Sequence, residues 1–213
     1  MTRAGIADEI HKPARRHYPR RKVLVFGLHD LLQIDLVDMQ AYSRYNKGYK
    51  YMLTSINCYS KFAWSVGIKS KSATCVTNAM AIILRDKRAR TANLQSDKGR
   101  EFLNSKFAAL MKKHKINHYT THTGMKCAIV ERFNRTLKNR MFRQFSIQAS
   151  HKWIDILPKI LAQYNSTRHS VTKMAPINVI DDSLMATVYN YEKKIDTSKR
   201  KASVGDIVRI SRH

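Results

Sequence analysis

The sequence predicts an α/β domain in which helices cover the faces of a mixed, five-stranded β-sheet. Two observations lead to this fold class. Residues 31 to 69 contain three strand-like segments joined by short turns, a pattern typical of an antiparallel meander. After residue 70 apolar residues recur at helical spacing, and helical and strand-like segments alternate along the chain. The 213 residues, 43% of them hydrophobic, are enough for one such core.

The predicted strands are short. The first, LLQIDLVDM at 31–39, alternates partly between apolar and polar residues, and the next two, at 50–60 and 62–69, are rich in β-branched and aromatic residues. Turns near Gly48 and Ser60 connect them. Two further strands are expected at 91–95 and 116–119. Short links between the first three favour antiparallel pairing.

Four helices are predicted from the spacing of apolar residues. One starts near Ser72, and a second covers residues 102–114 with Leu103, Phe107 and Leu110 on one face. A third and a fourth have apolar faces made by two series of residues: Val130, Phe133, Leu137 and Met141, then Trp153, Leu157, Ile160, Leu161 and Tyr164. Pro158 is expected to kink or restart the fourth helix.

Charge is the dominant feature of the composition. Lys and Arg number 40 against 15 acids, which gives a formal net charge of +25 and a sequence pI near 10.3. Such a charge favours a polyanionic partner, with nucleic acid as the natural candidate. An architectural protein that only coats nucleic acid and an enzyme that acts on it both fit this composition.

The termini differ in composition from the middle of the chain. Residues 1–22 are predicted to form a basic flexible arm and residues 23–181 the α/β core. Residues 182–203 are expected to be a basic linker, and the alternating residues 204–213 resemble the first strand of an SH3-like domain that is cut short. Both basic segments are candidates for nuclear import signals, so a nuclear location is expected.

Cysteine spacing and hydropathy indicate the cellular environment in which the protein works. The three cysteines form no C-x-x-C pair and no zinc-ligand spacing, and the longest apolar run, 79–84, is too short to span a bilayer. We therefore expect no disulfide framework, no zinc module and no membrane partner, and a reducing intracellular environment.

Three acids are candidates for chemistry. Asp35 lies between apolar residues of a strand, where an unpaired carboxylate is costly to bury. Asp97 follows a second apolar strand and precedes a Lys-Gly turn, and Glu131 lies on the polar face of the third helix. Each has a simpler interpretation: a salt-bridged strand acid, an ordinary turn acid, and an i,i+4 helix pair of Glu131 with Arg135.

Taken together and in order, these residues resemble the DDE-type integrases of retroviruses and retrotransposons, and most closely the integrases of Polinton or Maverick transposons. The resemblance rests on QID at 33–35, SDKGREF at 96–102, VERFNRTLK at 130–138 and WIDILPKILAQYNSTRHSVTKMAP at 153–176. It covers about residues 31–181 without large gaps. Leu32 stands where relatives often have Trp, and the zinc module of complete integrases has no counterpart here.

The resemblance implies an RNase H-like fold in which Asp35, Asp97 and Glu131 hold two Mg²⁺ ions, with Mn²⁺ as a substitute. It implies DNA 3′-end processing and strand transfer, and DNA contacts by Asn134, Arg135 and Lys138. Relatives act as homo-oligomers, so the same is expected here. A non-catalytic DNA-binding descendant of such an element is the alternative function.

Overall fold

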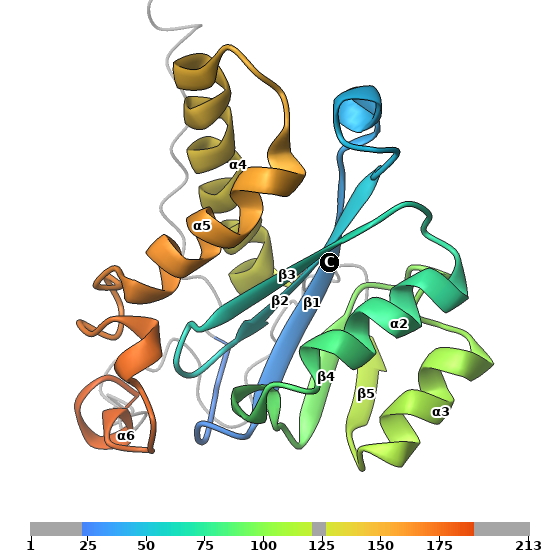
Figure 1. The fold of residues 1–213 in the computed structure, drawn as a ribbon. Coiled ribbons are helices and arrows are strands. Elements are labelled where there is room, and N and C mark those ends of the chain that lie inside the picture. Colours follow the sequence, from blue (N-terminus) through green and yellow to red (C-terminus); the bar gives the residue numbers. More distant parts are fainter. Residues whose placement is uncertain (1–22, 121–126, 190–213) are drawn as a thin grey trace, which may run out of the picture.

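The computed structural model describes residues 23–120 and 127–189. The predicted arm 1–22, the end of the predicted linker and the predicted strand 204–213 lie outside the described residues. The described part contains one five-stranded sheet in the order β3-β2-β1-β4-β5 (Figure 1). Its strands are β1 (Leu31–Asp38), β2 (Tyr51–Asn57), β3 (Ala63–Ile68), β4 (Asn93–Ser96) and β5 (Asn117–Thr120).

The pairing directions confirm a mixed sheet. Strand β1 pairs antiparallel with β2, and β2 pairs antiparallel with β3, so the first three strands form the predicted meander. Strand β1 pairs in parallel with β4, and β4 pairs in parallel with β5. Because β1, β4 and β5 run in one direction, their carboxyl ends lie at the same edge of the sheet.

Helices cover both faces of this sheet. Helices α2 (Ala73–Ile83) and α3 (Ser105–Lys113) lie on one face, and α4 (Ala128–Gln148) and α5 (Trp153–Ser166) lie on the other (Figure 1). Short helical turns are η1 (Gln40–Tyr45), η2 (Lys87–Ala89), η3 (Pro176–Asn178) and α6 (Leu184–Thr187). Within the described residues, the length and apolar character needed to cross a bilayer are found in none of these helices.

Alternation along β1 separates the two cores. Leu32 and Ile34 pack in the cluster that contains the apolar residues of α2 and α3. Val37 packs with α4 and α5, in a cluster that includes Phe133 and Trp153. By the two-residue period of a strand, Gln33 and Asp35 share the face of Val37 and therefore point toward α4.

Two predicted details of the helices are changed by the structure. Leu103 was expected on the buried face of a helix starting at residue 102, but it is 53% exposed. The prediction was wrong because α3 starts only at Ser105, where the Asn104 side chain caps the helix by accepting from the Phe107 N–H at 2.9 Å. Pro158 lies inside α5, which continues through it without a restart.

Residues beyond 181 pack against the body of the domain. The Asp182 carboxylate accepts a hydrogen bond from the Leu28 N–H at 2.6 Å, and the Tyr189 hydroxyl donates to the Tyr59 carbonyl oxygen at 2.7 Å. Leu184 and Tyr189 join a third apolar cluster with Val25. The packed unit therefore includes the first residues of the segment predicted as a linker.

A side chain from β1 holds the start of α4. Gln33 is fully buried, and its Oε1 accepts hydrogen bonds from the Ile129 N–H at 3.0 Å and the Val130 N–H at 3.1 Å. Its Nε2 donates to Gln95 Oε1 on β4 at 2.7 Å. The N-cap residue of α4, Cys127, makes no side-chain capping bond. Gln33 therefore satisfies helix N–H groups that lack a local partner and ties α4 to two strands.

The variant Gln33→Leu should lower the free energy of unfolding by about 1 to 3 kcal/mol, because it leaves the two helix N–H groups and the Gln95 amide without a partner. Urea denaturation followed by circular dichroism measures this. Gln148→Leu, at the exposed end of the same helix, is the matched control and should change stability by less than about 0.5 kcal/mol. Equal urea midpoints for the two variants would contradict the capping role.

Candidate active site

The three acids singled out in the sequence come from three elements that meet near the carboxyl edge of the parallel strands. Asp35 lies on β1 and faces α4, Asp97 directly follows β4, and Glu131 lies in the first turn of α4. The negative charges of Asp97 and Glu131 both act on the Asp35 carboxyl and raise its pKa. The fold therefore brings Asp97 and Glu131 each within electrostatic range of Asp35.

Burial is the main reason why the pKa of Asp35 is above its ordinary value. Hydrogen bonds oppose this effect: Oδ1 accepts from the Leu36 N–H at 2.8 Å, and Oδ2 accepts from the Asn134 side-chain amide at 2.7 Å. Within the described residues the single ion pair is that of Arg88 with Asp86. The simpler interpretation of Asp35 as a salt-bridged strand acid therefore has no support in the described structure.

Asp97 and Glu131 are exposed to solvent. Asp97 Oδ1 accepts from the Gly99 N–H at 3.0 Å, so this carboxylate does stabilise the turn that follows β4. Glu131 is not within ion-pair distance of Arg135 among the described residues, where Arg88 and Asp86 form the one pair. The i,i+4 helix pair considered for Glu131 is thus not formed.

The donor chemistry of these acids suits a divalent cation. Carboxylate oxygens are the hard ligands that Mg²⁺ and Mn²⁺ prefer, and a cation would offset the burial and the carboxylate repulsion that raise the pKa of Asp35. However, no group of three or more His, Cys, Asp or Glu side chains in residues 23–120 and 127–189 is arranged to hold a metal ion. Asp35, Asp97 and Glu131 thus have the ligand type and the location that a metal site needs, but their carboxylates do not converge on one metal position.

The three residues predicted to contact DNA differ in their surroundings. Asn134 is 7% exposed, and its Oδ1 is buried with no hydrogen-bond partner among the described residues. Arg135 is exposed beside Glu131, and Lys138 is half-buried. The pKa of Asp38 is lowered mainly by a hydrogen bond from the Gln40 backbone N–H. The Gln40 side chain and the charge of Lys138 lower it further. Lys138 therefore lies near the end of β1, and contact of these residues with DNA stays a prediction.

Two roles were not predicted from the sequence. The Gln33 side chain caps α4 and so positions the turn that carries Glu131, and the Asn134 amide donates to the Asp35 carboxylate. A polar residue at a buried position of a strand is a signal for the first role. The spacing of Asn134 from Val130, four residues and about one helical turn, is a signal for the second, because it places the amide on the buried side.

Comparison with known proteins supports the same fold. A sequence profile of the family described as integrase core domain matches residues 29–126, which is under half of the chain. The match contains Asp35 and Asp97 and ends before Glu131. A transposon-derived protein of Caenorhabditis elegans is 29% identical over 173 residues, covering 81% of this chain and 59% of the relative. The chain thus spans less than two thirds of that relative.

Solved structures share this fold although their sequences are 20% identical or less. The catalytic core domain of HTLV-2 integrase, in complex with magnesium and in a trimeric form, matches with a TM-score of 0.57 at 17% identity, over 74% of this chain and 97% of that one. The catalytic core of BIV integrase matches with a TM-score of 0.55 at 20% identity, over 69% and 90% of the two chains.

A larger assembly also matches. A chain of the simian T-cell lymphotropic virus intasome, in complex with the PP2A regulatory subunit B56 gamma, has a TM-score of 0.65 at 14% identity, over 93% of this chain and 66% of that one. The five-stranded mixed sheet with flanking helices is therefore the RNase H-like fold of integrase catalytic cores.

The electrostatic coupling of the acids can be measured by NMR titration of the Asp35 carboxyl. Its pKa should lie above the ordinary value in the native protein and fall in Asp97→Asn, because a neutral amide removes one of the charges that raise it. Asp155→Asn, which removes an exposed acid from α5, is the control and should leave the Asp35 pKa unchanged. An unchanged pKa in Asp97→Asn would show that the two carboxylates do not interact.

Proposed function

We propose that this chain is a metal-dependent polynucleotidyl transferase of the DDE integrase type, which cuts and joins phosphodiester bonds of double-stranded DNA. The observation that carries the proposal is that Asp97 and Glu131, which come from two other elements, lie close enough to Asp35 for their charges to act on its carboxyl. In a chain with a net charge of +25, three acids that gather without a basic partner within ion-pair distance in the described residues call for a functional reason.

In this proposal Asp35, Asp97 and Glu131 would hold two Mg²⁺ ions, or Mn²⁺ as a substitute. Such ions activate a nucleophile on one side of the phosphorus and stabilise the leaving oxygen on the other. The protein residues supply position: Asn134 fixes the Asp35 carboxylate through its hydrogen bond of 2.7 Å. Arg135 and Lys138, on the same helix as Glu131, would bind DNA phosphates beside the acids.

The proposed reaction has two steps, by analogy with the DDE integrases that the sequence resembles. Water first cuts near the end of an element's DNA, and the freed 3′-hydroxyl then attacks a phosphodiester in target DNA. The Polinton and Maverick transposon integrases remain our proposed subgroup. We also propose that the active form is a homo-oligomer in the nucleus. Trimeric and dimeric forms of the HTLV-2 core are structural precedents for assembly.

A second candidate is a non-catalytic DNA-binding protein derived from such an element. One observation favours it: among the described residues no three potential ligands are arranged to hold a metal. The charge of +25 would serve this function equally well. The two candidates differ in chemistry and in metal binding, and each difference gives a test.

Purified protein incubated with Mn²⁺ and supercoiled plasmid should convert the plasmid to nicked and joined forms. Asp97→Asn and Glu131→Gln should each reduce the rate at least about 100-fold, because each removes a charged oxygen ligand from the metal site. Asp155→Asn is the matched control, since it also replaces one exposed acid, and should retain full activity. Absence of nicking, or equal nicking by Asp97→Asn and the native protein, would favour the binding protein.

Metal binding can be measured without DNA. Saturating Mn²⁺ should raise the melting temperature of the native protein, because a ligand bound only by the folded state stabilises it. The rise should disappear in Asp97→Asn and persist in Asp155→Asn. A rise of equal size in all three proteins would place the bound metal elsewhere.

A further inference from the structure

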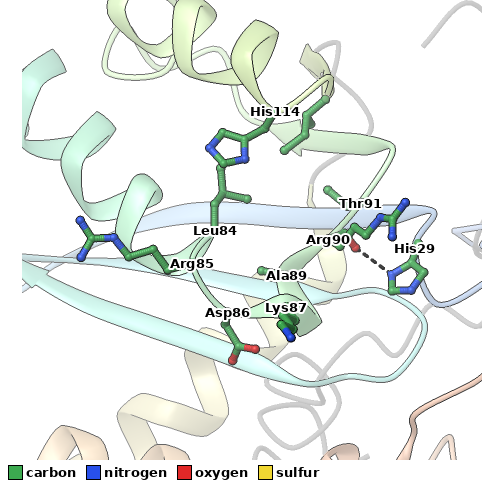
Figure 2. Close-up of a pocket in the computed structure, with 10 residues that line it drawn as sticks. His29, Leu84, Arg85, Asp86, Lys87, Ala89, Arg90, Thr91 and His114 are labelled. Carbon is green, nitrogen blue, oxygen red and sulfur yellow. Dashed lines mark hydrogen bonds between the residues drawn. The ribbon is translucent and has the colours of Figure 1, made fainter.

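A hollow of about 400 Å³ lies at the edge of the sheet opposite the three acids. It is bounded by residues that precede the parallel strands: His29 before β1, Ala89 to Thr91 before β4, and Ile116 before β5. Figure 2 shows it lined also by residues that follow α2. Thr91 and Asp97 are six residues apart along an extended chain, so the hollow and the acids are separated by roughly 20 Å.

The rim of the hollow is positively charged. Arg85, Lys87 and Arg90 are exposed there, and among the described residues none of them forms an ion pair. Asp86 is the one carboxylate in the lining, so the three cations and one anion give a net charge of +2 with both histidines neutral.

The Asp86 carboxylate is already bound on both oxygens. Oδ1 accepts from the Arg88 N–H at 2.9 Å, and Oδ2 accepts from the Trp64 indole N–H at 3.0 Å. Its ion-pair partner is Arg88 at 4.0 Å, which is not among the lining residues. Asp86 is therefore held toward β3 and forms no ion pair with Arg85, Lys87 or Arg90 within the described part of the chain.

The remaining lining adds an apolar floor and an oriented imidazole. Ala89 and Ile116 are buried beneath the rim. His29 Nδ1 lies 3.0 Å from the Arg90 carbonyl oxygen. Because a carbonyl oxygen can only accept a hydrogen bond, Nδ1 is the ring nitrogen that donates. Figure 2 shows the side chains of Arg85, Lys87 and Arg90 leaving the backbone in different directions.

We infer that this hollow and its basic rim bind the phosphodiester backbone of a second nucleic-acid segment, separate from the segment at the acids. Cations that spread around a surface match phosphates repeated along a strand, whereas a single compact anion would need them to converge. With the Asp86 charge counted, the lining keeps a net charge of +2. The inference does not require catalysis, since a DNA-binding descendant of an integrase would use the same surface.

Salt-dependent binding tests the surface directly. The triple variant Arg85→Gln, Lys87→Gln, Arg90→Gln is compared with the control Lys47→Gln, Lys152→Gln, Lys159→Gln. The control removes three exposed cations: one between η1 and β2, one just before α5 and one on α5. For a 30-base-pair duplex, the slope of log affinity against log salt should become shallower by up to about 2.7 in the first variant, at about 0.9 per lost phosphate contact. The control should keep the native slope, and equal slopes in the two variants would overturn the inference.

Acetylation of lysines in the otherwise native protein, read by mass spectrometry, is the second measurement. The duplex should protect Lys87 several-fold and leave Lys159 unprotected. The same acetylation measurement is repeated with pyrophosphate in place of the duplex. If pyrophosphate protects Lys87 and the duplex does not, the hollow is a small-anion site and the inference is wrong. The variant Asp97→Asn should not nick plasmid. If the duplex still protects Lys87 in this variant, DNA binding at the hollow is independent of the proposed catalytic activity.

Discussion

The contact between Gln33 and the first turn of α4 is the constraint on which the arrangement of the site depends. Gln33 lies between the apolar residues of β1, and its amide joins β1 to β4 through Gln95 and to α4 through two backbone N–H groups. Asp35 is two residues further along the same face of β1, and Glu131 is the residue after the capped N–H groups. A single buried amide thus sets the position of one acid relative to another.

This constraint has an electrostatic consequence. Burial raises the pKa of the Asp35 carboxyl, and the charges of Glu131, held by the contact of α4 with β1, and of Asp97, held by the pairing of β4 with β1, raise it further. Asn134 and the Leu36 N–H partly offset this cost by donating hydrogen bonds to Asp35. The fold therefore maintains a carboxylate in a place that is unfavourable for stability, as functional sites often do. Elsewhere in the domain, apolar packing against both faces of the sheet supplies the stability.

The parallel strands also give the domain two chemically different edges. The three acids lie near the carboxyl ends of these strands, and the segments that precede the strands carry a basic rim whose one carboxylate accepts hydrogen bonds from Trp64 and the Arg88 N–H. Both edges belong to one rigid sheet, so a nucleic-acid strand at one edge and a second strand at the other would be held in a defined relation. An enzyme that joins two DNA segments, and a protein that only bridges them, would both use this arrangement.

The sequence by itself determined most of the architecture. Residue composition, turns and periodicity located all five strands and the start of α2 to within a few residues, and helical spacing identified the buried faces of α4 and α5, because apolar residues facing a sheet recur at two-residue or helical spacing. It placed Asp35, Asp97 and Glu131 as candidates through their order and their resemblance to integrase motifs. The start of α3 was missed, because a side-chain cap at Asn104 and not the apolar pattern decides it.

Only the tertiary structure decided which residues meet. The Gln33 cap, the Asn134 bond to Asp35 and the basic hollow all join residues that are far apart in the chain, and their formation depends on packing that no local pattern encodes. The packing of Tyr189 on Tyr59, across 130 residues, has the same origin. The spacing of apolar residues indicates which face of a helix or strand is buried. Which residues pack against that face depends on the arrangement of all the elements in the tertiary structure.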